Sequence, residues 1–230
     1  MRALPSPLLA VTDRHGHARS LAETVQAILD GGGRWIWFRD RDLEPAERLR
    51  LGEVVAARVR AAGGSLTVGG DVALTRVLGA DGVHLGGGSG PEAIAAARDA
   101  LGAGARIGVS VHAPQEVAQA AAAGADYVTL SPIFPSASKP GYGPALGSGG
   151  LVAARRTGLP VVALGGIGPD TVAKCRRAGA AAVAIMGGLM RAGDPAAAAR
   201  ALLQAWGEQS AGNPDSEGPV PRGSGPSTSS

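Results

Sequence analysis

Two pairs of glycines are the first residues in this sequence whose type and spacing suggest chemistry. Each pair follows an apolar run: Gly165 and Gly166 come after residues 161–164, and Gly187 and Gly188 come at the end of the run 180–186. Glycines at such places leave backbone N–H groups open to an approaching anion, and proteins bind phosphates in this way. Either pair alone is typical of an ordinary tight turn. Two pairs on consecutive strands favour a phosphate site.

Basic side chains that could bind an anion follow an earlier apolar run. Trp37, Arg39 and Arg41 alternate along WFRDR, so their side chains share one face of an extended chain. The alternative is that the arginines are surface charges paired with Asp40 and Asp42. A guanidinium presents a planar fork that suits phosphate oxygens. We therefore favour anion binding by the two arginines.

A regular alternation of strands and helices must position these groups. Strands are predicted over residues 8–12, 34–39, 65–68, 81–85, 106–110, 126–131, 161–164 and 180–186. Helices are predicted over 20–29, 45–62, 72–78, 91–101, 114–123, 151–156 and 195–206, with one more beginning at Pro169. This α/β pattern is typical of a parallel (β/α)8 TIM barrel formed by residues 1–206, and a doubly wound open sheet is the alternative. Phosphate often binds the loops after barrel strands seven and eight, where the glycine pairs stand.

The composition argues against several other classes of protein. Aromatic residues make up 3% of the 230 residues, and the net charge of +3 comes from dispersed basic residues, so nucleic acid is not an expected partner. No segment approaches the length of a membrane span. The single cysteine, Cys175, cannot form an internal disulfide and suits the reducing cytoplasm. Residues 207–230 are rich in Gly, Pro and Ser and are predicted to be a disordered tail, while the oligomeric state is left open.

Seven short motifs together carry a resemblance to a known family. They are VTDR at 11–14, WFRDR at 37–41, GADGVHLG at 79–86, IGVSVH at 107–112, GADYVTLSPIFPSASKPG at 124–141, VVALGGIGPD at 161–170 and AVAIMGG at 182–188. In this order they resemble the thiamine-phosphate synthase family, which includes the related thiazole tautomerases. The resemblance implies a TIM barrel. It also implies a transferase that joins hydroxymethylpyrimidine diphosphate to thiazole phosphate and releases diphosphate with Mg²⁺.

The resemblance assigns roles on the pyrimidine side. The family has Gln, Arg and Lys where this chain has Trp37, Arg39 and Arg41, and these residues grip the pyrimidine and its diphosphate. Trp37 loses the amide and could instead stack on the ring. Ser110 matches a serine that faces the diphosphate.

The thiazole phosphate side is also matched. Ser136, Ser138 and Lys139 resemble the family's Thr-x-Thr-Lys, and hydroxyls beside an ammonium can hold phosphate oxygens. Gly166, Met186 and Gly187 match the family's phosphate cup. We expect the neighbouring Gly165 and Gly188 to complete it.

The expected metal ligands are missing. The resemblance implies an Asn-Asp pair after strand three and an Asp after strand four, and these places hold Gly69, Gly70 and Ser89. Asp71 stands one position late. Mg²⁺ is therefore implied as a cofactor, but no ligand set for it is predicted. Diphosphate departure would then rely on the arginines with Lys139.

Three functions stay open at this point. A synthase lacks its metal carboxylates, and a tautomerase lacks its histidine after strand six, where this chain has Pro132. A non-catalytic barrel that binds the phosphorylated thiazole is the third possibility. Of the histidines, His84 is expected in the barrel interior. His112 is expected at the mouth, where it is the better acid–base candidate, although a solvated loop histidine is the default interpretation. Only the synthase needs a diphosphate-binding set, so we favour it.

Overall fold

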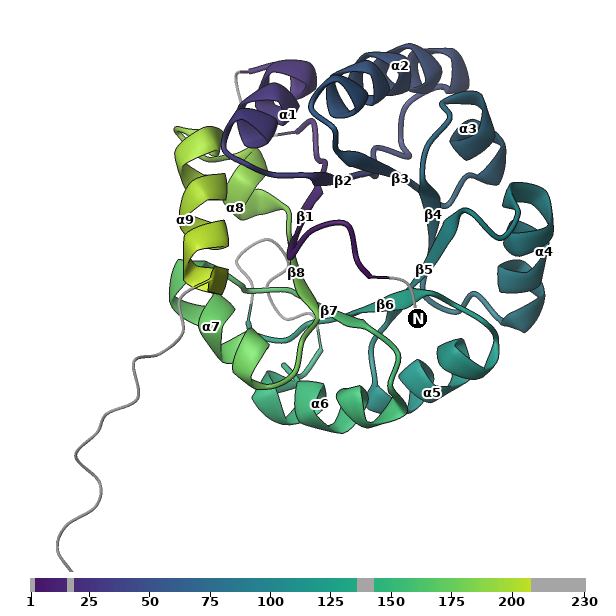
Figure 1. Cartoon of the computed structure of the whole chain (residues 1–230), viewed down its shortest axis with the longest axis vertical. Coiled ribbons are helices and arrows are strands. Elements are labelled where there is room, and N and C mark those ends of the chain that lie inside the picture. Colours follow the sequence, from purple (N-terminus) through teal and green to yellow (C-terminus); the bar gives the residue numbers. More distant parts are fainter. Residues whose placement is uncertain (1–2, 16–18, 136–142, 208–230) are drawn as a thin grey trace, which may run out of the picture.

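Eight parallel strands close into a barrel in the order β1 to β8, with helices around the outside (Figure 1). This computed structural model describes residues 3–15, 19–135 and 143–207, so Ser136, Ser138, Lys139 and residues 208–230 lie outside the described residues. The strands are β1 Leu8–Val11, β2 Trp35–Phe38, β3 Ser65–Gly69, β4 Gly82–Leu85, β5 Arg106–Val111, β6 Tyr127–Leu130, β7 Val161–Leu164 and β8 Ala182–Ile185. The predicted TIM barrel is confirmed, and the open-sheet alternative is wrong.

The helices follow the strands as predicted, with one addition. They are α1 Leu21–Asp30, α2 Pro45–Ala61, α3 Val72–Val77, α4 Pro91–Leu101, α5 Pro114–Ala122, α6 Gly147–Ala154, a 3₁₀ turn Arg155–Thr157, α7 Pro169–Arg177, α8 Gly187–Met190 and α9 Pro195–Gly207. Prolines begin many of these helices, since the first turn needs no backbone donor there. The short helix α8 was not predicted, because four residues carry no periodic signal.

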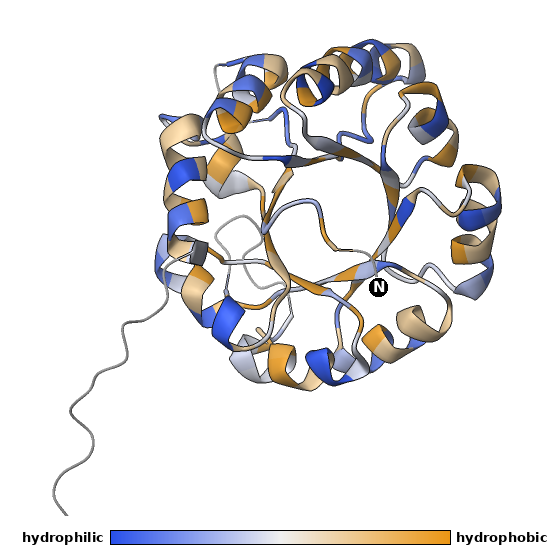
Figure 2. Ribbon diagram, in the orientation of Figure 1, coloured by the Kyte–Doolittle hydropathy of each residue, from blue (hydrophilic) through white to orange (hydrophobic). Residues whose placement is uncertain are grey.

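Alternation along the strands divides the core into two parts. One set of side chains packs between the sheet and the helices. The polar faces of the helices point outward, away from the sheet (Figure 2). The other set fills the barrel, where Trp35, Trp37 and Tyr127 face small residues such as Ala182. A Cβ on Gly108 would lie 2.2 Å from the Tyr127 ring, so this glycine makes room for a large interior side chain. Three aromatic side chains, Trp35, Trp37 and Tyr127, therefore lie in the interior of the barrel.

The end of β2 differs from the prediction. The strand stops at Phe38, so Arg39 and Arg41 stand in the loop that follows it. The reason is a side-chain contact: the backbone N–H of Arg39 donates to the Thr12 hydroxyl at 2.9 Å. This frees the chain to turn away from the sheet at the barrel mouth. Among the described residues, no helix is long and apolar enough to cross a membrane.

Candidate functional site

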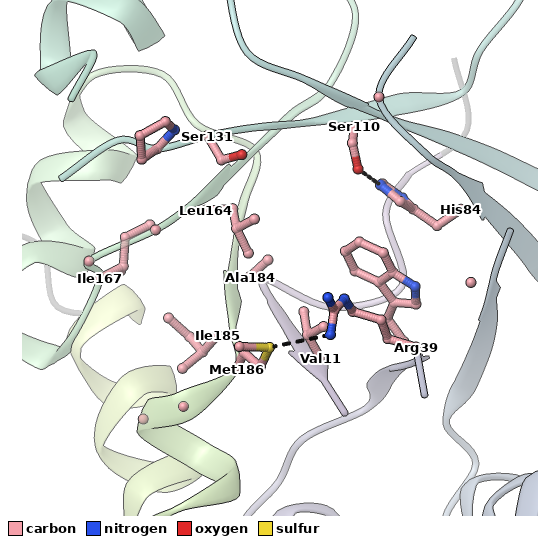
Figure 3. A pocket seen from close by; sticks show the side chains of 18 of the residues that line it. Val11, Arg39, His84, Ser110, Ser131, Leu164, Ile167, Ala184, Ile185 and Met186 are labelled. Carbon is pink, nitrogen blue, oxygen red and sulfur yellow. Dashed lines mark hydrogen bonds between the residues drawn. The ribbon is translucent and has the colours of Figure 1, made fainter. Parts of the chain in front are cut away.

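A pocket of about 560 Å³ opens at the carboxyl ends of the strands. This volume is in the usual range for small-molecule sites. Every candidate substrate-contacting residue that the structure describes lines it: Trp37, Arg39, Arg41, Ser110, Gly165, Gly166, Met186, Gly187 and Gly188. Loops far apart in the sequence thus meet at one place (Figure 3).

Arg39 and Arg41 do not pair with the acidic residues beside them. Asp40 is buried, accepts a hydrogen bond from the Thr12 hydroxyl and also accepts the backbone N–H of Arg14 at 2.9 Å. Asp42 forms its ion pair with Arg14 at 2.7 Å. No ion pair with a described carboxylate is present at Arg39 or Arg41. The alternative pairing of the arginines with Asp40 and Asp42 is therefore not what the structure shows, and both arginines line the pocket.

Arg39 contacts a residue that follows another strand. Its Nη1 lies 4.0 Å from the Met186 sulfur, so residues after β2 and β8, the two neighbours of β1, meet at the mouth (Figure 3). Methionine sulfur is only a weak acceptor. The guanidinium keeps most of its donors available to a ligand.

Trp37 stands on the pocket wall above His84. The two rings lie 4.0 Å apart between centroids, at 42°. The indole Nε1 is buried and finds no acceptor among the described residues. A Cβ on Gly69 would lie 3.0 Å from this nitrogen, so the glycine at position 69 makes room for the indole. The two departures from the family pattern are thus linked by packing, because the tryptophan at position 37 needs the space that a glycine at position 69 leaves.

His84 lies at the centre of a buried hydrogen-bond chain. Its Nε2 is 3.0 Å from the Ser110 hydroxyl, and its Nδ1 is 3.0 Å from the Tyr127 hydroxyl. Burial, with the nearby positive charge of Arg41, lowers the pKa of His84 to about 3. The imidazole is therefore neutral near pH 7, which fits the predicted interior position rather than acid–base work.

One consistent direction for these hydrogen bonds starts at their Trp35 end. Trp35 Nε1 can only donate, and it donates to the Thr67 hydroxyl at 2.9 Å. The Thr67 hydroxyl in turn bonds Tyr127. We infer that Thr67 donates to Tyr127, that Tyr127 donates to His84 Nδ1, and that His84 Nε2–H donates to Ser110. The Ser110 proton is then left to point toward the pocket.

The glycine pairs form one wall, which we call the glycine cup (Gly165, Gly166, Gly187 and Gly188). Gly166 has φ +62°, and a Cβ on it would lie 2.3 Å from the Pro135 carbonyl oxygen. Tight packing against the loop after β6 therefore explains part of this pair. Gly187 and Gly188 begin α8, a short extra helix after β8. TIM barrels commonly place phosphates at this combination of loops and helix.

Two further residues at the mouth matter for the site. His112 lines the pocket as expected, and its Nδ1 lies 2.9 Å from the Ser131 carbonyl, so Nδ1 carries the proton when the ring is neutral. Arg191 was not predicted. It follows α8, lines the pocket and pairs with Asp13 at 3.1 Å. Its only sequence signal is a basic residue shortly after the second glycine pair.

The positions expected to hold a metal have other surroundings. Gly70 has φ +65° and no side chain, and Ser89 does not line the pocket. Asp71 caps α3 by accepting the Leu74 N–H at 2.8 Å and pairs with Arg48 at 3.0 Å. Among residues 3–15, 19–135 and 143–207, no three His, Cys, Asp or Glu side chains gather as a metal would require.

Comparisons with known proteins agree with this geometry. The family model described as thiamine monophosphate synthase matches residues 8–189. The thiamine-phosphate synthase of Chromobacterium violaceum is 42% identical over 201 residues, covering 87% of this chain and 96% of the relative. That of Roseiflexus castenholzii is 40% identical and covers 84% of each.

Solved structures show the same fold. The thiamine phosphate pyrophosphorylase from Pyrococcus furiosus superposes with a TM-score of 0.76 at 28% identity, covering 86% of this chain and 94% of that one. A 3-hexulose-6-phosphate synthase superposes with a TM-score of 0.67 at 23% identity and shows the fold alone. On the family model and the two synthases together, the chain belongs to the thiamine-phosphate synthase family.

Proposed function

We propose that this protein is a thiamine-phosphate synthase, a transferase that joins hydroxymethylpyrimidine diphosphate to thiazole phosphate. The observation that carries this proposal is a single pocket lined both by the guanidinium groups of Arg39 and Arg41 and by the glycine cup. Groups of both kinds bind anions, and the proposed reaction brings two phosphorylated substrates together. The names of the relatives support the same reaction.

The chemistry needs charge stabilisation more than proton transfer. The bond between the pyrimidine methylene carbon and the diphosphate oxygen breaks, and its electron pair leaves with the diphosphate. The lone pair of the thiazole nitrogen forms the new C–N bond, which gives a thiazolium ion. No proton moves in this step, so a neutral His84 is compatible with it. Donors that meet the leaving oxygens lower the barrier.

Each substrate has a natural place in the pocket. Arg39, Arg41 and the Ser110 hydroxyl would hold the diphosphate, with Trp37 against the pyrimidine ring. The glycine cup and Met186 would hold the thiazole phosphate. Ser136, Ser138 and Lys139 complete this assignment in the proposal, although they lie outside the described residues.

The tautomerase alternative is less well supported. Pro132 lines the pocket at the position where the tautomerase resemblance expects a histidine. We also propose a cytoplasmic location, since the sequence has a single cysteine and so no internal disulfide, as is usual in a reducing compartment.

A coupling assay with both purified substrates tests the function. We expect formation of thiamine phosphate and release of diphosphate in equal amounts. Titration with thiazole phosphate and with the dephosphorylated thiazole alcohol tests the glycine cup, and the alcohol should bind far more weakly. Binding of both compounds without any coupling would favour the non-catalytic barrel instead.

A further inference from the structure

The lining of the pocket does not suit a divalent cation. It includes Arg39, Arg41 and Arg191, together with two histidines, and it contains no Asp or Glu among the described residues. Mg²⁺ binds through carboxylates and phosphate oxygens. A metal ion in this pocket would meet positive charge instead of ligands. The Mg²⁺ implied by the family resemblance therefore does not fit the residues present.

The acidic side chain next in sequence to Gly70 is already engaged. Asp71 has one carboxylate oxygen on the Leu74 N–H and the other on Arg48 Nη1, at 2.8 and 3.0 Å. The same Arg48 donates to the Gly69 carbonyl at 2.8 Å. Turning Asp71 toward the pocket would break the cap of α3 and leave a largely buried guanidinium without its counter-ion, which is costly.

A guanidinium lies beside one of the two positions where the resemblance expects a carboxylate, Gly70. Arg41 Nη1 lies 3.2 Å from where a Cβ on Gly70 would be, and 3.8 Å from the corresponding point on Gly86. Gly70 and Gly86 have no side chains, so neither loop fills this space. The side chain of Arg41 therefore lies across the ends of β3 and β4, where side chains at 70 and 86 would otherwise project.

We propose that Arg41 takes over the role of the divalent cation, so that this chain binds and releases an organic diphosphate without a metal. This inference rests on the proposed function. The bonds made and broken are those given above. The charge that builds on the departing diphosphate is met by the forks of Arg39 and Arg41, each able to give two parallel N–H···O bonds.

Titration of the full-length protein with inorganic pyrophosphate tests this directly. After treatment with EDTA, we expect pyrophosphate to bind, with an affinity that Mg²⁺ changes by less than about threefold. Arg41→Ala should weaken binding by about tenfold or more, as for loss of a charge-assisted pair. Arg50→Ala is the matched control, because Arg50 is an exposed arginine of α2 outside the pocket, and it should bind as the parent does.

The coupling assay separates failure of this inference from failure of the function. Turnover that persists in EDTA and falls in Arg41→Ala supports the inference. Turnover and pyrophosphate binding that both require Mg²⁺ overturn it while keeping the synthase assignment. No turnover with or without Mg²⁺ overturns the assigned reaction, and the pyrophosphate titration then still decides whether the pocket holds a diphosphate without metal.

A gain-of-function variant gives a second measurement. Gly70→Asp combined with Ser89→Asp restores carboxylates at the places that the resemblance expects. Aspartate tolerates the positive φ of Gly70 better than most residues. We expect the pair to make pyrophosphate binding depend on Mg²⁺. If the parent protein already shows the same dependence, Arg41 does not replace the cation.

Discussion

The orientation of one hydroxyl depends on residues that no ligand touches. Trp35, Thr67 and Tyr127 are buried, and the donor direction that we infer for them leaves the proton of His84 on Nε2 and the Ser110 proton directed at the pocket. The motif GVHLG predicts an interior histidine. The motif does not predict the hydrogen-bond chain through His84, because the residues of that chain come from strands that are distant in sequence and meet only when the barrel closes.

Removing one link of this chain should affect catalysis more than folding. In Tyr127→Phe the donor to His84 Nδ1 is lost, so the ring can adopt either tautomer and the Ser110 proton is no longer directed at the substrate. We expect kcat to fall by about tenfold, roughly the value of one hydrogen bond, with little change in KM for thiazole phosphate. Steady-state kinetics with each substrate varied in turn measures this.

Thr75→Val is a matched control for Tyr127→Phe. It also deletes a buried hydroxyl, but Thr75 lies on α3 and bonds the Asp71 carbonyl, away from the pocket lining. Equal effects of the two substitutions on kcat would mean that the chain through His84 serves stability alone.

His84 also makes the free energy of unfolding depend on pH. The folded-state pKa of His84 is about 3, against 6.5 for the ordinary side chain. Between these values only the unfolded chain takes up the proton, so this contribution to stability is complete above pH 6.5 and declines as pH falls toward 3. The slope is at most about 1.4 kcal/mol per pH unit.

Urea unfolding across this pH range measures the effect. His84→Gln removes the titrating ring, so its free energy of unfolding should fall less steeply between pH 6.5 and 4.5 than that of the parent. The groups facing His84 are Tyr127, Ser110 and Thr129, with Arg41 acting through its charge. None of these is a carboxylate that would titrate in the same range. Parallel slopes for variant and parent would contradict a neutral buried histidine.

At the scale of elements, the structure explains why strand ends rather than strands form the site. The predicted strands and helices are confirmed within a few residues, because alternating apolar residues and proline starts are strong local signals. The sequence could also predict which loops converge, since all parallel strands end at one mouth. It could not predict that Gly69 yields space to Trp37, because that contact joins two strands through side-chain shape.

The loop after β6 and the end of β7 are packed backbone to backbone. Gly166→Ala would place a methyl group 2.3 Å from the Pro135 carbonyl oxygen, at φ +62°. Both effects disfavour the native loop, so we expect a loss of stability of about 1–3 kcal/mol together with weaker binding of thiazole phosphate. Thermal unfolding and calorimetric titration measure the two.

Gly168→Ala is the matched control in the same loop. Gly168 has φ −142°, and a Cβ there would meet no atom within 4 Å. It should leave stability and thiazole phosphate affinity nearly unchanged. A similar loss in both variants would show that the segment is sensitive to any side chain, and the specific approach of Pro135 would not be the cause.

At the scale of the whole molecule, closure of the helical ring depends on a helix beyond the family match. The match ends at residue 189, before α9. This helix packs against α1 and α7 and buries Ala199 and Leu202 (Figure 1). Its first turn lies so close to α1 that a Cβ on Gly31 would sit 2.4 Å from the Ala196 carbonyl oxygen.

Two truncations therefore separate the barrel from the segment that follows it. A chain ending at residue 207 keeps every described element, and we expect its Tm to lie within about 2 °C of the full chain, with unchanged coupling activity.

A chain ending at residue 194 exposes the apolar surface of α1 and α7 that α9 covers. Loss of Leu202 and its neighbours from the core should cost several kcal/mol, roughly 2–5 for a single large core side chain, and this chain should unfold well below the parent. Calorimetric unfolding compares all three chains. Equal Tm values for the chain ending at 194 and the full chain would mean that α9 is not needed for closure of the ring, while a large drop for the chain ending at 207 would place part of the stabilising surface in residues 208–230.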